Sequence, residues 1–167
     1  MATPRRKLEP ATTAQKKTLK GVRVMIVESR YYEDVATELL KGAKRALDEA
    51  GVAYDVFEAQ GALEIPAAVA IAYDGGKKKR KPYDGAVALG CVIRGETSHY
   101  DIVAGDSARA LMDFSVAHRF PIGNGILTVD TDAQAQRRAD TGKDDKGGGA
   151  ARAVLSLIAL KRQFGLK

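Results

Sequence analysis

The chain has 167 residues, of which 45% are hydrophobic and 29% are charged, and it contains a single cysteine. This length fits one domain, and the balance of apolar and charged residues excludes a mainly disordered chain. A lone cysteine excludes an intramolecular disulfide and a cysteine-rich zinc module. No apolar run approaches the roughly 20 residues of a membrane span, and no apolar stretch follows the basic N-terminus. We therefore expect a soluble, cytoplasmic protein without membrane association.

The formal net charge of +6 raises the question of nucleic-acid binding. Of the 27 basic residues, six lie in residues 1–20 and five in residues 77–81, which leaves 16 basic against 20 acidic residues elsewhere. Such runs are usually solvated segments. Only Tyr83 flanks the second run as an aromatic, so a platform for stacked bases is not indicated. We expect no nucleic-acid partner, a flexible basic tail over residues 1–20, a basic loop at 77–81 and one domain over residues 21–167.

Apolar runs alternate with helical patterns along this domain. Residues 22–27 predict a short buried strand, and residues 34–50 carry apolar side chains at helical spacing. Similar patterns predict three further strands and four further helices, namely strands over 52–57, 83–89 and 122–129 and helices over 62–73, 101–120, 131–139 and 149–164. Strands separated by helices imply crossover connections. The predicted fold is therefore α/β, a flavodoxin-like three-layer α/β/α sandwich with a four-stranded parallel sheet.

Ligands of such sheets bind beyond the carboxyl ends of the strands, so the segments after the strands are the place to look for chemistry. These segments are residues 28–32, 60–64, 92–99 and 128–138. The chain contains neither G-x-x-x-x-G-K-[ST] nor a G-x-G-x-x-G after the first strand. It also lacks a G-x-S-x-G elbow, and Cys91 has no basic partner close in sequence. These absences argue against the common nucleotide-binding and hydrolase classes.

The segment Gly-Glu-Thr-Ser at residues 95–98 lies between a predicted strand and a predicted helix, where free backbone N–H groups attract an anion. A plain helix cap is the more ordinary interpretation of Thr97 and Ser98. The neighbouring His99 is placed either to shuttle a proton near neutral pH or only to bond the helix start. His118, at the end of the same helix, is expected to act only as a favourable charge there.

The remaining polar groups at the strand ends also have two interpretations each. Glu64 either complements a helix dipole or accepts hydrogen bonds from ligand hydroxyls. Arg138 is by default a surface charge. Tyr31 and Tyr32 are more typical of packing residues than of a stacking platform. None of these segments identifies a function alone.

Four strings taken together are more specific: GALEIPAAV (61–69), LGCVIRGETSHYDIV (89–103), GNGILTVDTDAQAQRRA (123–139) and KGGGAARAVL (146–155). Through them the chain resembles the lumazine synthase family from about residue 22 to residue 165. The resemblance implies a transferase of riboflavin biosynthesis that condenses 5-amino-6-(D-ribitylamino)uracil with 3,4-dihydroxy-2-butanone 4-phosphate. The product is 6,7-dimethyl-8-ribityllumazine, and phosphate and water are released. No metal or other cofactor is implied.

Site residues are carried over from the family position by position. The resemblance implies that the catalytic residue is His99, which moves protons. Contacts to the pyrimidine and ribityl groups are expected from Tyr31, Ala62, Leu63, Glu64, Val92, Ile93, Asn124 and Lys146. Phosphate contacts are expected from Glu96, Thr97 and Arg138.

The resemblance also implies that the sites lie between neighbouring subunits of a homopentamer, with Arg138 and Lys146 supplied by the second subunit. Some members close twelve pentamers into a hollow icosahedral shell, whereas others stop at pentamers or decamers. Riboflavin synthase is a candidate partner. Asn124 departs from the family, which often has an aromatic there that covers the ligand. Two alternatives stay open: a paralogue that binds riboflavin-like ligands without catalysis, and a scaffold whose assembly is its working property.

Overall fold

A computed structural model describes residues 9–166 of the chain. In chain order its elements are α1 (Thr13–Thr18), β1 (Arg23–Ser29), α2 (Glu33–Ala50), β2 (Ala53–Ala59), the 3-10 turn η1 (Ala62–Glu64), α3 (Ile65–Lys78), β3 (Gly85–Ile93), α4 (His99–His118), β4 (Ile122–Val129), α5 (Asp132–Ala139) and α6 (Lys146–Gln163). Within residues 9–166, no helix is long and apolar enough to cross a membrane.

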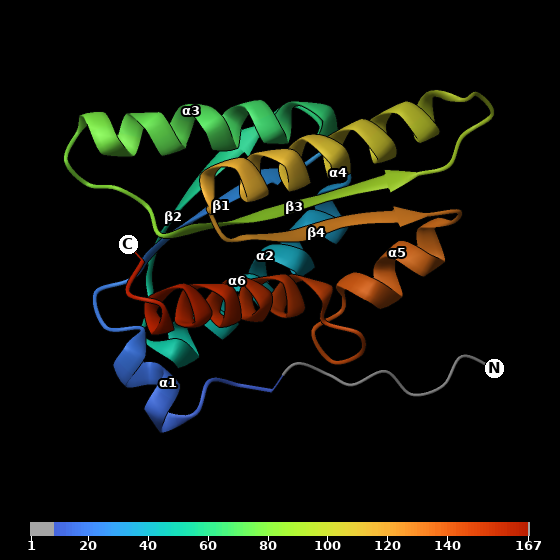
Figure 1. The fold of residues 1–167 in the computed structure, drawn as a ribbon. Coiled ribbons are helices and arrows are strands. Elements are labelled where there is room, and N and C mark those ends of the chain that lie inside the picture. Colours follow the sequence, from blue (N-terminus) through green and yellow to red (C-terminus); the bar gives the residue numbers. More distant parts are fainter. Residues whose placement is uncertain (1–8, 167) are drawn as a thin grey trace.

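The four strands form one parallel sheet in the order β2-β1-β3-β4. Helices α3 and α4 cover one face of this sheet, and α2, α5 and α6 cover the other (Figure 1). The helices between the strands cause this arrangement, because a parallel neighbour can be reached only by a crossover connection. The predicted flavodoxin-like, three-layer α/β/α fold with four parallel strands is confirmed.

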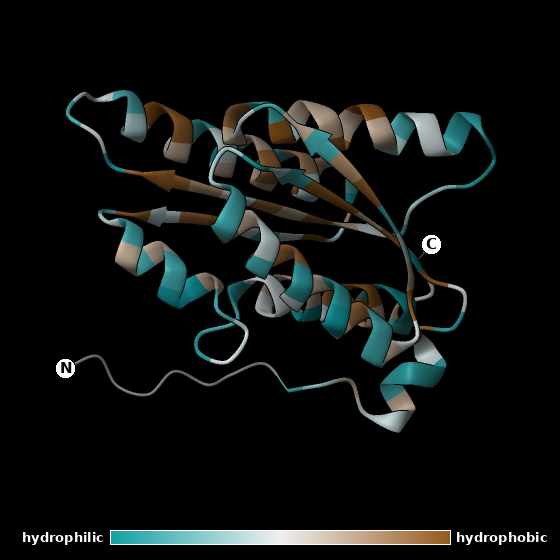
Figure 2. Cartoon of the chain, turned by 180° about the vertical axis from the view of Figure 1, so that it is seen from behind, coloured by the Kyte–Doolittle hydropathy of each residue, from teal (hydrophilic) through white to brown (hydrophobic). Residues whose placement is uncertain are grey.

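Both faces of β1 are buried, which explains its unbroken apolar sequence. Val24 and Ile26 belong to a core cluster with residues of α2 and α6, whereas Met25 and Val27 pack with residues of α3 and α4. Figure 2 shows hydrophobic residues along the strands and hydrophilic residues over much of the outer helices. The two cores hold the sheet rigidly, so the positions of the strand ends are fixed.

The second helix of the domain differs from its predicted bounds. It begins as the 3-10 turn η1 and continues as α3 to Lys78, so the first two residues of the basic run at 77–81 are helical rather than part of a loop. Gly76 permits this extension, because a Cβ on it would lie 2.9 Å from the Lys81 carbonyl oxygen, where the chain turns back. Lysines in a last helical turn also complement the helix dipole.

The third strand, predicted over residues 83–89, spans Gly85–Ile93. Its pairing with β4 continues to the end, where Val92 lies opposite Thr128 and Ile93 opposite Val129. The glycine at the predicted strand end does not break the ladder. Val92 and Ile93 are therefore strand residues, and the loop to α4 is shorter than the sequence predicts.

Part of the predicted tail over residues 1–20 forms the short helix α1 before β1. A reciprocal capping box closes the N-terminus of α1, and Leu19, which follows the helix, is 1% exposed. The Arg162 guanidinium donates to the carbonyl oxygens of Thr18 and Lys20, which ties this segment to α6. The first eight residues of the predicted tail lie outside the described part of the chain.

Helix α6 begins at Lys146, earlier than the predicted start at residue 149. The glycines that follow Lys146 are needed for packing: a Cβ on Gly147 would lie 2.0 Å from the Leu39 carbonyl oxygen of α2. Asp145 caps the helix, because its side chain accepts the Gly148 N–H at 3.2 Å. The backbones of α2 and α6 thus approach closely at the start of α6.

Candidate active site

The carboxyl ends of β1 and β3 lie side by side in the centre of the sheet, where Val27 pairs with Ala88 and Glu28 with Leu89. From β1 the chain crosses to β2 on one side, and from β3 it crosses to β4 on the other (Figure 1). Such a reversal of strand order opens a crevice in which ligands of parallel sheets bind. The segment with Tyr31 follows β1, and the loop before His99 follows β3.

The two tyrosines after β1 differ in environment. Tyr32 packs against the core beside α2, whereas Tyr31 is 75% exposed. Their rings meet edge to face, with centroids 5.1 Å apart. The packing role predicted for both tyrosines is therefore confirmed for Tyr32 and wrong for Tyr31. An aromatic ring held by a packed neighbour and open to solvent can stack on a planar ligand.

A buried ion pair lies beneath this turn, and the sequence prediction missed it. Glu28 is 4% exposed, and its carboxylate accepts hydrogen bonds from the Arg30 guanidinium at 3.2 and 3.3 Å. Arg30 also donates to the Thr37 hydroxyl of α2 at 2.8 Å. Burial raises the pKa of Glu28, and the charge of Arg30 opposes that rise. A carboxylate at the end of an otherwise apolar strand is the signal that could have identified the pair.

The turn η1, which follows β2, packs against β3 and α4. Ala62 is 6% exposed and anchors the turn, while Leu63 is 39% exposed. Glu64 is exposed, and a Cβ on Gly61 would lie 2.8 Å from its Oε2 atom. Glycine at position 61 therefore leaves room for the carboxylate to fold back over the turn. This places an accepting group on a turn that packs against α4.

The loop between β3 and α4 combines hydroxyl, carboxylate and imidazole groups. Glu96, Thr97 and His99 are exposed, and the Thr97 hydroxyl accepts the His99 backbone N–H at 3.4 Å. Ser98 occupies the N-cap position but makes no side-chain cap hydrogen bond. The ordinary cap interpretation therefore fails for Ser98. Apart from the His99 N–H, the first-turn N–H groups of α4 have no side-chain cap, and such groups are suited to bind an anion.

Arg94 holds this loop from its strand side, and the sequence prediction missed this contact as well. Its guanidinium lies 3.3 Å from Asp130 at the end of β4 and 3.3 Å from Asp101 of α4. It also lies over the Tyr100 ring, 4.1 Å from the centroid. The hydrogen bond to Asp101 is the main cause of a raised pKa of Arg94. These exposed ion pairs contribute little stability. They do join the end of β4 to the first turn of α4, on either side of the loop at residues 95–98.

Arg138 and Lys146 lie in the other helical layer, on α5 and at the start of α6 (Figure 1). The Arg138 guanidinium donates to the Gln134 carbonyl of its own helix at 3.1 Å. Lys146 is exposed. Within residues 9–166, no hydrogen bond or ion pair joins either side chain to Tyr31, Glu64 or His99. A single chain therefore presents two separate sets of predicted site residues.

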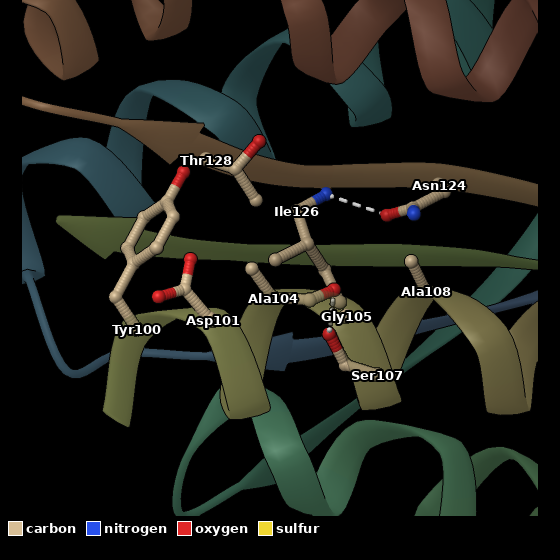
Figure 3. Close-up of a pocket in the computed structure, with 9 residues that line it drawn as sticks. All are labelled: Tyr100, Asp101, Ala104, Gly105, Ser107, Ala108, Asn124, Ile126 and Thr128. Carbon is tan, nitrogen blue, oxygen red and sulfur yellow. Dashed lines mark hydrogen bonds between the residues drawn. The ribbon is translucent and has the colours of Figure 1, made fainter. Parts of the chain in front are cut away.

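Asn124 is also separate from the strand ends. It lies early on β4 opposite Ala88, where it lines a groove of about 400 Å³ between β4 and α4 (Figure 3). Its Oδ1 atom accepts the Ile126 N–H at 3.0 Å. The Asn124 side chain thus accepts one backbone N–H on the free edge of its own strand. The sequence alone could not have predicted this bond.

Cys91 lies on β3 near Tyr32 and is expected to be unreactive. Burial, with a smaller contribution from Asp132, raises the pKa of the Cys91 thiol to about 11. Only about one thousandth of the thiol is then ionised at pH 8, and the thiolate is the reactive form. We expect a disulfide reagent to label the folded protein slowly at pH 8 and rapidly in urea. Equal labelling rates in the two conditions would contradict this expectation.

The model of the 6,7-dimethyl-8-ribityllumazine synthase family matches residues 21–162, which include every predicted site residue. The chain belongs to this family. It is 61% identical over 150 residues to the 6,7-dimethyl-8-ribityllumazine synthase of Methylorubrum extorquens strain PA1, covering 90% of this chain and 87% of that protein. It is 55% identical over 164 residues to the synthase of the same name from Afipia carboxidovorans, covering 98% of both chains.

Proposed function

We propose that the chain catalyses the family's reaction, the condensation of 5-amino-6-(D-ribitylamino)uracil with 3,4-dihydroxy-2-butanone 4-phosphate in riboflavin biosynthesis. The observation that carries this proposal is the grouping of Tyr31, Glu64, the 95–98 loop and His99 around the carboxyl ends of β1 and β3. These groups offer an aromatic face, a hydroxyl acceptor, an anion site and a proton carrier. The aromatic face suits a planar pyrimidine, the acceptor suits the hydroxyls of a ribityl chain, and the anion site suits a phosphate ester.

In this proposal each substrate has its own part of the crevice. Tyr31 stacks on the pyrimidine, and Glu64, next to the buried Ala62, accepts hydrogen bonds from the ribityl hydroxyls. Leu63 covers the chain, while Val92 and Ile93 offer backbone groups to the ring edge. The phosphate binds at the start of α4 with Glu96 and Thr97, and Arg138 and Lys146 approach from a neighbouring subunit, as does Asn124.

The chemistry requires little beyond positioning. The substrate amine is already a nucleophile and the ketone an electrophile, so holding them in register supplies much of the acceleration, an effect that can reach about 7–11 kcal/mol. The 5-amino group and the ketone form an imine with loss of one water, phosphate leaves by elimination, and ring closure through the ribityl-bearing nitrogen releases a second water. The protons of these steps pass through His99. A guanidinium such as that of Arg138 stabilises the charge of the departing phosphate.

Replacement of His99 tests the proton-transfer role. We expect His99→Ala to lower kcat by about 100-fold, at the low end of general acid–base effects, because positioning by the other groups persists. Initial rates of lumazine formation would measure this change, with His118→Ala at the far end of α4 as the matched control. An unchanged rate in His99→Ala would remove the imidazole from the mechanism.

The separation of Arg138 and Lys146 from the other groups supports the proposal of sites shared between subunits of a homopentamer. Apolar side chains on α4 are also left open in the single chain: Ile102 is 51% exposed, Met112 57% and Val116 70%. Sedimentation velocity should give a mass of about 90 kDa, five times the chain mass of 17.9 kDa, or a multiple of it. A monomer at micromolar concentration would contradict shared sites.

We also propose that the enzyme acts in the cytoplasm. Riboflavin synthase is the proposed partner, because the released lumazine must be consumed by a further enzyme.

The decisive experiment for the activity is a turnover assay with both purified substrates. Lumazine formation is followed by absorbance or fluorescence, and phosphate release is measured in parallel. Equal rates of the two products would support the proposal, and each substrate alone is the control. Binding of the pyrimidine substrate without any turnover would instead identify a binding paralogue, and Asn124 would be the first residue to replace.

A further inference from the structure

Asp145 has an environment that no proposed site role accounts for. It is 8% exposed and adopts the left-handed conformation, with φ 45° and ψ 53°, directly before Lys146. For a residue other than glycine this conformation is uncommon, and aspartate and asparagine tolerate it best because their short side chains bond locally. The local bond here is the helix cap to the Gly148 N–H.

Two helices converge on the Asp145 carboxylate. Its Oδ2 atom lies 3.0 Å from the Arg45 guanidinium of α2 and 3.0 Å from the Arg152 guanidinium of α6. The side chain of Arg152 is only 16% exposed, and its Nε atom is buried without a hydrogen-bond partner. Asp145 is therefore the counter-ion of a nearly buried cation, and its loss would leave that cation unpaired.

Glycine at position 42 leaves the space that the Asp145 side chain occupies. A Cβ on Gly42 of α2 would lie 2.3 Å from the Asp145 Oδ1 atom. The Asp145 N–H donates to the Asp140 carbonyl at 3.1 Å, which fixes the loop that returns from α5. Asp145 is thus held by α2, by α6 and by the loop that joins the two helices carrying Arg138 and Lys146.

We propose that Asp145 is a positioning residue, which acts through Lys146 by fixing the turn from which that lysine projects. This inference rests on the proposed function, because it requires Lys146 to act in the site. Asp145 itself need not touch substrate. Its left-handed backbone, its cap and its two arginine partners set the direction in which α6 begins, and so the place of the lysine ammonium.

A double-mutant cycle tests the inference. We expect Asp145→Ala to lower kcat/KM about tenfold, and we expect no further loss when the same change is made in Lys146→Ala, because a residue that acts through another is not additive with it. Asp145→Asn keeps the left-handed conformation and the cap acceptor, so it should recover activity to within about threefold of the unaltered chain. Asp144→Asn, which removes only a half-exposed ion pair at 3.9 Å from Arg137, is the matched control.

Two results would overturn the inference. One is an equal fold-loss from Asp145→Ala in both lysine backgrounds. The other is a lowered unfolding midpoint with kcat and KM of the folded enzyme unchanged, which would mean a role in stability alone. If Asp145→Ala does not fold, the same cycle is run with Asp145→Asn, for which a small loss that vanishes in Lys146→Ala supports the inference and a loss that persists overturns it. Lys146→Ala alone tests the assumption beneath the inference, since full activity there would overturn the lysine's site role separately.

Discussion

Arg138→Ala is expected to lower kcat/KM by about 1,000-fold. A charge-assisted hydrogen bond contributes about 1.5–3 kcal/mol, and a donor aimed at charge that develops in the transition state is worth up to about 4 kcal/mol. In the proposed site the guanidinium both holds the phosphate and stabilises it as it leaves. Its removal should therefore raise KM for the phosphate-bearing substrate and lower kcat, while KM for the pyrimidine changes little. Steady-state rates with each substrate varied in turn would separate these effects.

The adjacent Arg137 provides the control for this experiment. Its guanidinium is largely exposed and makes only a long ion pair, 3.9 Å from Asp144. We expect Arg137→Ala to retain nearly full activity. Arg138→Lys should recover only part of the loss, because an ammonium cannot form the two-pronged contact of a guanidinium. Equal effects at both arginines would point to a general loss of positive charge instead of a phosphate contact.

Gly147→Ala is expected to cost about 4 kcal/mol or more in the free energy of unfolding, at the severe end of single substitutions. The added methyl group would lie 2.0 Å from the Leu39 carbonyl oxygen and 2.7 Å from its carbon. These are backbone atoms, so no rotamer change relieves the overlap, and α6 must move away from α2. Urea denaturation followed by circular dichroism would measure the loss.

Gly149→Ala is the matched control, because it makes the same change in the same helix. A Cβ on Gly149 meets nothing within 4 Å. Alanine is favoured over glycine in a helix by about 1 kcal/mol, so this variant should be slightly more stable than the unaltered chain. If both variants were destabilised alike, close packing of Gly147 on Leu39 would not be the cause.

The parallel sheet, its order of helices and strands and the location of polar groups at the strand ends could all be predicted from the sequence. These features depend on local patterns, because runs of β-branched residues and the spacing of apolar residues in a helix both involve residues close together in the sequence. The errors are at boundaries. The glycines at 147 and 148 suggest a loop by propensity, but they lie inside α6. Gly147 must be small because of α2, about a hundred residues away, and Gly148 because of the capping side chain of Asp145.

The site was predicted less completely than the fold. Exposed groups such as Tyr31 and His99 were selected from a motif, and the structure brings them to the same end of the sheet. Two buried ion pairs were missed. The Glu28–Arg30 pair had a signal, the carboxylate at the end of an apolar strand, whereas the pair of Asp145 with Arg45 joins residues a hundred positions apart, which no spacing rule reveals. Asn124 shows the same limit, because the bond to its own strand depends on which edge of the sheet is free.

The close contact between α2 and α6 has a consequence for synthesis on the ribosome. Helix α2 emerges early, but the face that contains Leu39 and Gly42 is completed only by residues 147 and 148, about a hundred positions later. A nascent chain therefore carries this face uncovered through most of its translation, and a domain folds as a unit only when its partners are present. The interval between the exit of α2 and that of α6 is the period in which the growing chain most needs a chaperone.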